Sequence, residues 1–99
     1  MPFYVYILKC SDGTYYTGRT SNIDRRMNAH YNGVDRQAYT FSRRPVDLVW
    51  FQEFNLENDA FRFEHQIKGW SRKKKEALIN GDWDEMKRII EDQKQKRKT

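Results

Sequence analysis

The sequence predicts a small α+β domain in which a three-stranded antiparallel sheet is flanked by helices, in the order β-β-α-β-α-α-α. Two observations support this prediction. Two runs of β-branched and aromatic residues meet across a short turn near the N-terminus, and a third such run follows a helical segment. After the third run, apolar residues recur at helical spacing almost to the end of the chain. We find no internal repeat and no linker long enough to separate domains.

The first two strands are predicted to form a β-hairpin. Residues 3–10 (FYVYILKC) and 14–20 are separated by Ser11-Asp12-Gly13, a sequence typical of a tight turn. Both alternating sets of side chains in the first run are apolar, so this strand should be central and covered on both faces. Gly18 lies within the second run, where glycine weakens strand pairing. It indicates a bulge or the close approach of another group.

The first helix should begin at a capping box formed by Ser21 and Asp24 and end at Gly33. Between these residues, apolar side chains recur every four positions and define one helix face. Residues 34–45 are polar and lack periodicity, so we expect an irregular connection. The run 46–54 (VDLVWFQEF) is the predicted third strand.

Three further helices are predicted after the sheet. The first of them covers residues 58–70 with Asn58 as its cap, and the next begins at Ser71 and ends at Asn80-Gly81. A last helix would begin at a capping box formed by Asp82 and Glu85. Its buried residues would be Trp83, Met86, Ile89 and Ile90. We therefore expect one domain over residues 1–92, followed by a basic, disordered tail over residues 93–99.

The composition excludes several classes of protein. With 99 residues, 37% of them hydrophobic and 15% aromatic, the chain has enough apolar mass for one core, which excludes wholesale disorder. No apolar run approaches the roughly 18 residues of a membrane span, and none near the N-terminus is long enough for a signal peptide. The single cysteine, Cys10, excludes an internal disulfide. We expect a soluble, cytoplasmic protein, a monomer by default, with no membrane partner.

The formal net charge of +5 comes mostly from residues 93–99, which hold four basic side chains and no acidic one. Without these residues, fifteen basic side chains face fourteen acidic ones. What remains is local clustering. The clusters are Arg19 with Arg25 and Arg26, then Arg43 with Arg44, and then Arg72, Lys73, Lys74 and Lys75. Such clusters either neutralise phosphates or form an ordinary solvated surface.

Two predicted helices present polar groups beside their apolar faces. On the first, Arg26 and His30 border the apolar stripe, where partial desolvation requires hydrogen-bonding partners. The alternative for Arg26 is a structural arginine whose stem covers apolar surface. On the second, Glu64 projects into the middle of an aromatic arc, which is costly for an unpaired carboxylate. Glu64 is therefore either a metal ligand or the partner of a buried arginine, and the spacing leaves both open.

The ordered spacing of these residues resembles the GIY-YIG nuclease domain. Tyr4-Val5-Tyr6 matches the first tripeptide of that name and Tyr16-Thr17-Gly18 the second, with Arg26 ten residues after Tyr16 and Glu64 on a later helix. More closely, residues 4–83 resemble the small stand-alone members of the family. The runs YTGRTSNIDRRMNAHYNG and FEHQIKGWSRKKKEALINGDW are typical of them. Tyr4 in place of glycine and Thr17 in place of isoleucine are departures that affect the backbone more than the chemistry.

The resemblance implies metal-dependent hydrolysis of phosphodiester bonds in nucleic acid. It assigns Tyr6, Tyr16, Arg26 and His30 to catalysis and Glu64 to a single Mg²⁺ or Mn²⁺ ion, and we expect these five to converge in one cleft. A lone carboxylate suits an ion that completes its shell with water and substrate phosphate, and the planar fork of Arg26 matches phosphate oxygens. A tyrosine with a pKa near 10 is a poor base at neutral pH. Which tyrosine is the base stays open, and His30 could share the role.

Three functions remain in competition. The first is a metal-dependent endonuclease acting on nucleic acid, with DNA as the expected partner. The second is a non-catalytic nucleic-acid-binding module on the same fold, because 99 residues leave no room for a separate binding domain. The third is a protein-interaction domain, which the joint presence of the five site residues argues against. The predicted nucleic-acid contacts are Arg19, Arg25, Arg43, Arg44, Arg72, Lys73 and Lys74.

Overall fold

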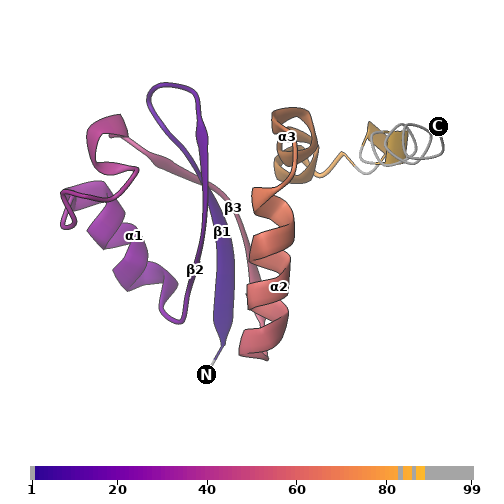
Figure 1. Cartoon of the computed structure of the whole chain (residues 1–99), viewed down its shortest axis with the longest axis horizontal. Helices are drawn as coiled ribbons and strands as arrows, with labels where there is room; N and C mark the ends of the chain where they lie inside the picture. The colour runs from indigo at the N-terminus through magenta and orange to yellow at the C-terminus, as the bar shows by residue number, and fades with distance from the viewer. Residues whose placement is uncertain (1, 83, 86, 89–99) are drawn as a thin grey trace. The chain divides into compact units, whose positions relative to one another are not determined.

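The computed structural model of the chain describes residues 2–82, 84, 85, 87 and 88. Its elements follow the predicted order (Figure 1). They are β1 (Phe3–Lys9), β2 (Tyr15–Thr20), α1 (Ile23–Asn32), β3 (Asp47–Phe54), α2 (Glu57–Lys68) and α3 (Arg72–Asn80), with a short 3₁₀ helix at Phe41–Arg43. The predicted α+β class is confirmed. In the part of the chain that the structure describes, no helix is long and apolar enough to cross a membrane.

The chain divides into two compact units, residues 1–68 and 69–99. The first holds the whole sheet with α1 and α2, and the second holds α3. The expected single domain over residues 1–92 stays a prediction. The apolar residues expected in a fourth helix (Trp83, Met86, Ile89 and Ile90) and the tail 93–99 lie outside the described residues. The side chain of Asp82 accepts a hydrogen bond from the backbone N–H of Glu85 at 3.0 Å, as expected of a helix cap.

The three strands form one antiparallel sheet in the order β2-β1-β3, so β1 is the central strand, as predicted. Its residues 5–8 are completely buried. The hairpin turns at Gly13, whose φ of +83° favours glycine, and the backbone N–H of Cys10 donates to the carbonyl of Thr14 at 2.8 Å. Cys10, the only cysteine of the chain, is buried at the end of β1.

The two faces of the sheet are covered by different helices. Side chains alternate along a strand, and Tyr6 and Leu8 of β1 pack in one cluster with Met27 of α1. The opposite face packs against α2, whose Phe63 contacts the rings of Trp50 and Phe54 of β3. In Figure 1, α1 and α2 accordingly lie on either side of the strands. The central strand is thus apolar on both faces because each face is covered by a helix.

The observed helix ends correct two of the predicted caps. Asn22, and not Ser21, caps α1, because its extended backbone lets its side-chain oxygen accept the N–H of Arg25 at 3.1 Å. Helix α2 begins at Glu57, so Asn58 lies in its first turn and is not the cap. Acidic residues in that first turn favour this start electrostatically. The predicted ends at Gly33 and Gly81 are confirmed, since both glycines adopt the left-handed conformation.

Candidate functional site

Tyr6 occupies the centre of the sheet and joins β1 to α1 by hydrogen bonds. Its hydroxyl oxygen lies 3.3 Å from Nε of Arg26 and 2.9 Å from Nε2 of His30. Arginine can only donate, so the phenol oxygen accepts from Arg26. Because Tyr6 is completely buried, its own proton needs an acceptor, which Nε2 of His30 provides. Helix α1 presents both partners from one face because Arg26 and His30 stand four residues apart.

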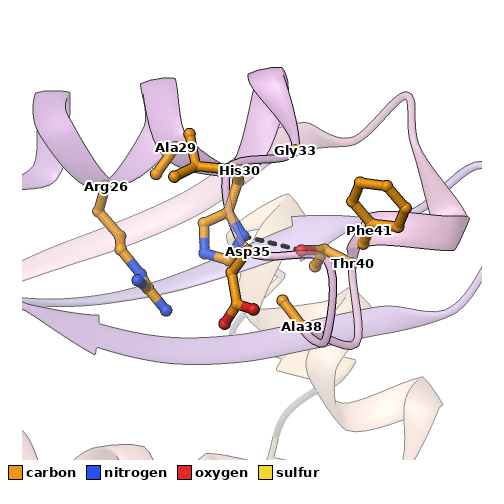
Figure 2. A pocket seen from close by; sticks show the side chains of 9 residues that line it. Arg26, Ala29, His30, Gly33, Asp35, Ala38, Thr40 and Phe41 are labelled. Carbon is orange, nitrogen blue, oxygen red and sulfur yellow. Dashed lines mark hydrogen bonds between the residues drawn. The ribbon is translucent and has the colours of Figure 1, made fainter.

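The hydrogen bond from Tyr6 determines the tautomer of His30. With Nε2 as the acceptor, the ring proton of the neutral imidazole is on Nδ1. Nδ1 then donates to Oγ1 of Thr40 at 2.9 Å, the contact drawn as a dashed line in Figure 2. Thr40 is 2% exposed and lies in the connection between α1 and β3. Thr40 is not among the predicted site residues, because an irregular polar segment has no periodicity that would indicate an inward-facing residue.

Gly18 makes room for the Tyr6 ring on the neighbouring strand. Gly18 is the direct partner of Tyr6 in the register of β1 and β2. A Cβ atom added at Gly18 would lie 2.3 Å from the Tyr6 hydroxyl oxygen and 2.4 Å from Cζ. Any other residue would therefore displace the tyrosine ring. Of the two explanations expected for this glycine, close approach by another group is the one observed.

The surroundings keep Tyr6 and His30 neutral near pH 7. Burial is the main cause that raises the pKa of Tyr6, and the hydrogen bond from Arg26 only partly opposes it. Burial also lowers the pKa of His30, and the positive charge of Arg26 lowers it further. Tyr6 is consequently a hydrogen-bond donor and not a ready base.

Tyr16 lies beside this network in a more open position. It is half-buried, its ring stacks on Tyr39 with centroids 5.9 Å apart, and its edge meets His30 at 5.5 Å. Arg26 interacts electrostatically with the hydroxyl groups of both Tyr6 and Tyr16. The four predicted residues Tyr6, Tyr16, Arg26 and His30 therefore come together on the α1 face of the sheet.

Glu64 approaches from the other face of the sheet. Its side chain is about 10% exposed, with Oε2 3.1 Å from Nζ of Lys68 and Oε1 3.8 Å from Nε of Arg19. The Arg19 guanidinium also lies over the ring of Phe61, 4.9 Å from its centroid. The charge of Glu64 adds to the rise in the Tyr6 pKa, so the two groups interact electrostatically. Helix α2 covers the face that Arg19 occupies, and the convergence of all five residues in one cleft stays a prediction.

The donor set around Glu64 restricts the metal that it suits. Among the described residues, no group of three or more His, Cys, Asp or Glu side chains is arranged to hold a metal ion. A single carboxylate fits a hard ion that keeps most of its waters, such as Mg²⁺ or Mn²⁺, and does not fit a closed zinc site. An ion bound there would compete with Lys68 and Arg19 for the same two oxygens.

Like Arg19, which pairs with Glu64, the predicted nucleic-acid contacts Arg43 and Arg44 have partners within the protein. Arg43 pairs with Asp12 at 3.0 Å and lies over the ring of Tyr39. Arg44 lies over the ring of Phe41 and donates to its carbonyl at 2.9 Å. Both side chains hold the 34–45 connection together. Arg25, by contrast, is exposed on the first turn of α1. A nucleic-acid role for these arginines stays a prediction.

The basic side chains at the start of α3 also contact other residues of the protein. Arg72 pairs with Glu76 at 3.5 Å, and Lys73 pairs with Glu85 at 3.4 Å. Lys74 is only 7% exposed, with its ammonium 4.3 Å from the centre of the Trp70 ring. Of this cluster, Arg72 and Lys73 are the more accessible to a phosphate, and their predicted contacts with nucleic acid remain to be tested.

Comparison with known proteins gives a consistent result. The model of the GIY-YIG catalytic domain matches residues 2–77. The chain is 44% identical over 80 residues to UPF0213 protein BH0048 of Halalkalibacterium halodurans, covering 81% of this chain and 84% of that protein. It is 47% identical over 76 residues to UPF0213 protein VNG_2274C of Halobacterium salinarum, covering 77% of this chain and 97% of that protein.

Solved structures agree with the fold. The solution NMR structure of UPF0213 protein BH0048 from Bacillus halodurans is similar with a TM-score of 0.55 at 43% identity, covering 83% of this chain and 86% of that chain. The solution NMR structure of protein EF2693 from E. faecalis is similar with a TM-score of 0.58 at 29% identity, covering 82% of this chain and 85% of that chain.

Proposed function

Because the chain belongs to the GIY-YIG family, we propose that it is a metal-dependent endonuclease that hydrolyses phosphodiester bonds in nucleic acid, with DNA as its preferred substrate. The observation that supports this most is the contact of Arg26 with Tyr6, backed by His30 and Thr40. The buried Tyr6 fixes the position of Arg26, yet the Arg26 side chain stays accessible to solvent. Packing of the core does not require such an arrangement. Such an arginine suits a negatively charged ligand.

The reaction needs charge neutralisation on the phosphoryl oxygens, a base for the attacking water, and help for the leaving oxygen. Arg26 supplies the first through its planar fork of donors. Tyr16, which is half-buried next to Arg26, is the group that contacts the attacking water. Tyr6 and His30 are positioning residues, since they are buried and hold Arg26 in place. A Mg²⁺ or Mn²⁺ ion bound by Glu64 would supply further positive charge toward the substrate phosphate.

A matched pair of arginines tests the proposal. Arg26→Ala should lower kcat by about 100-fold or more, as expected when one transition-state donor is removed, and this loss should far exceed any weakening of the Kd for nucleic acid. Arg25→Ala removes the same charge from the neighbouring exposed position and should leave kcat nearly unchanged. The assay uses labelled single-stranded, duplex and branched DNA and RNA, with Mg²⁺, Mn²⁺ or EDTA. Equal loss of kcat in both variants would contradict the role of Arg26.

Glu64→Gln tests the metal site, since the amide is nearly isosteric with the carboxylate. We expect metal-dependent cleavage to disappear while the Tm stays close to that of the wild type. A large drop in Tm, with cleavage retained by the folded fraction, would instead make Glu64 the structural partner of Arg19 and Lys68.

The second candidate function is a non-catalytic module that binds nucleic acid. It is favoured by the two cations that already occupy the oxygens of Glu64. Binding without cleavage under every metal condition would support this module over the endonuclease.

A further inference from the structure

A pocket opens next to the site, between α1 and the segment that follows it (Figure 2). Its volume of about 70 Å³ has room for roughly five water molecules at about 10–15 Å³ each. That is close to the size of one planar nucleobase. The side chains of Ala29, Ala38 and Phe41 supply apolar walls. The pocket therefore suits a flat ligand whose faces pack against these apolar walls.

The polar residues that line this pocket are Arg26, His30, Thr40 and one carboxylate, that of Asp35. Asp35 lies at the rim, and in Figure 2 its carboxylate points into the space between Arg26 and Ala38. Oδ1 of Asp35 accepts the backbone N–H of Gln37 at 3.0 Å. Each carboxylate oxygen can accept two hydrogen bonds, so the group retains capacity for a ligand with two adjacent donors. Guanine presents two such N–H donors side by side, at N1 and N2, whereas the other bases present one donor group on the same edge.

Arg26 connects the pocket to the reaction centre. The same side chain lines the pocket and donates to the hydroxyl of Tyr6. A phosphate bound by Arg26 is separated from the base of its own nucleotide by a single sugar, so that base can reach the pocket. An unpaired base is favoured, because a paired base enters a pocket only after its pairing and stacking are broken, which costs free energy.

We propose that the pocket is a specificity site for an unpaired guanine next to the phosphate held by Arg26, recognised by the carboxylate of Asp35. This inference rests on the proposed action on nucleic acid. It adds to that action a base preference and the residue that determines it.

The test measures binding in EDTA, where metal-dependent cleavage does not occur. Fluorescence anisotropy is recorded with short labelled oligo-dT strands that carry one central dG, dA, dC or deoxyinosine, or no substitution. We expect dG to bind at least tenfold tighter than unsubstituted oligo-dT. Deoxyinosine lacks the N2 amine and should lose most of that advantage.

Two variants and one control locate the preference. Asp35→Asn keeps an oxygen for the N–H of Gln37, so the turn should persist while the dG advantage disappears. Ala38→Leu fills the pocket and should remove the same advantage. Asp24→Asn makes the same charge change at an exposed position on the first turn of α1. It should change the affinity for every strand by the same factor.

The outcomes separate this proposal from the proposed endonuclease. Equal affinity for all strands, or a dG advantage that survives in either Asp35→Asn or Ala38→Leu, overturns the guanine site. Metal-dependent cleavage would still stand in that case. Failure to bind any of the strands, together with no cleavage of any substrate, overturns both proposals.

Discussion

On the α1 face of the sheet, Tyr6, His30 and Thr40 form a buried chain of hydrogen bonds between neutral groups. On the α2 face, Glu64 is instead held by ion pairs with two partly exposed cations, Arg19 and Lys68. A buried hydrogen-bonded chain costs much to break, because each partner left behind is buried without a bond. Ion pairs with exposed side chains contribute little and can exchange partners with water. The hydrogen bonds on the α1 face therefore fix the positions of their side chains. On the α2 face, the carboxylate of Glu64 can exchange its partners.

Among variants that test this difference between the two faces, Gly18→Val should lower the stability most. It inserts a side chain where the Tyr6 ring lies. Overpacking of this kind costs typically ~1–3 kcal/mol, and we expect the upper end of that range in urea unfolding, together with loss of activity. Gly81→Ala is the control, because a Cβ there meets nothing within 4 Å and only the backbone conformation at φ +66° is penalised. An equal or smaller loss for Gly18→Val than for Gly81→Ala would contradict the assigned packing.

His30→Ala should cause the second-largest loss of stability. It leaves the Tyr6 hydroxyl and the Thr40 hydroxyl buried without their present partner. The expected loss is about 1–3 kcal/mol in the free energy of unfolding. A His65→Ala variant, at an exposed position on α2, is the comparison and should change stability far less. Similar losses for both histidines would mean that the buried chain does not stabilise the fold.

A smaller effect should appear in the pH dependence of stability. The pKa of His30 is lowered by burial and by Arg26, so the folded protein binds a proton there less readily than the unfolded chain. Below the unfolded pKa of about 6.5, protonation therefore favours unfolding, and stability falls as the pH is lowered. The Tm of the wild type should drop more between pH 7.5 and pH 5 than that of His30→Gln. Parallel Tm curves for the two proteins would refute this linkage.

The smallest effect belongs to the α2 face. Lys68→Met removes an exposed partner of Glu64 and should cost only about 0.3–0.5 kcal/mol, the usual value for an i,i+4 helix pair. Raising the salt concentration should shrink this difference further. A loss above 1 kcal/mol would show that the ion pairs fix Glu64 as firmly as hydrogen bonds fix Tyr6.

The sequence predicts those features that depend on interactions between residues close together in the chain. Strand alternation and helical spacing are local, so they predict the central strand, the stops at Gly33 and Gly81, and the side-by-side position of Arg26 and His30. The choice of Asn22 over Ser21 as a cap depends on the backbone angles of a single residue, which no pattern specifies.

Contacts between distant segments are beyond such patterns. Arg43 finds Asp12 across 31 positions, so an arginine predicted to contact phosphate has a structural partner. Thr40 reaches His30 from a segment without periodicity. The approach of Glu64 from the opposite face depends on which side of the sheet α2 covers, and helical spacing contains no information about that side.

Because Cys10 is buried at the end of β1, the rate at which its thiol is labelled reports how often the hairpin opens. The thiol is 4% exposed, and burial raises its pKa above the ordinary value, so a thiol reagent in solution reacts with it only when the hairpin opens. The chain has no second cysteine, so a single labelling rate reports a single event. Measured on the wild type and on Gly18→Val, that rate would time the opening of the central strand without any added probe.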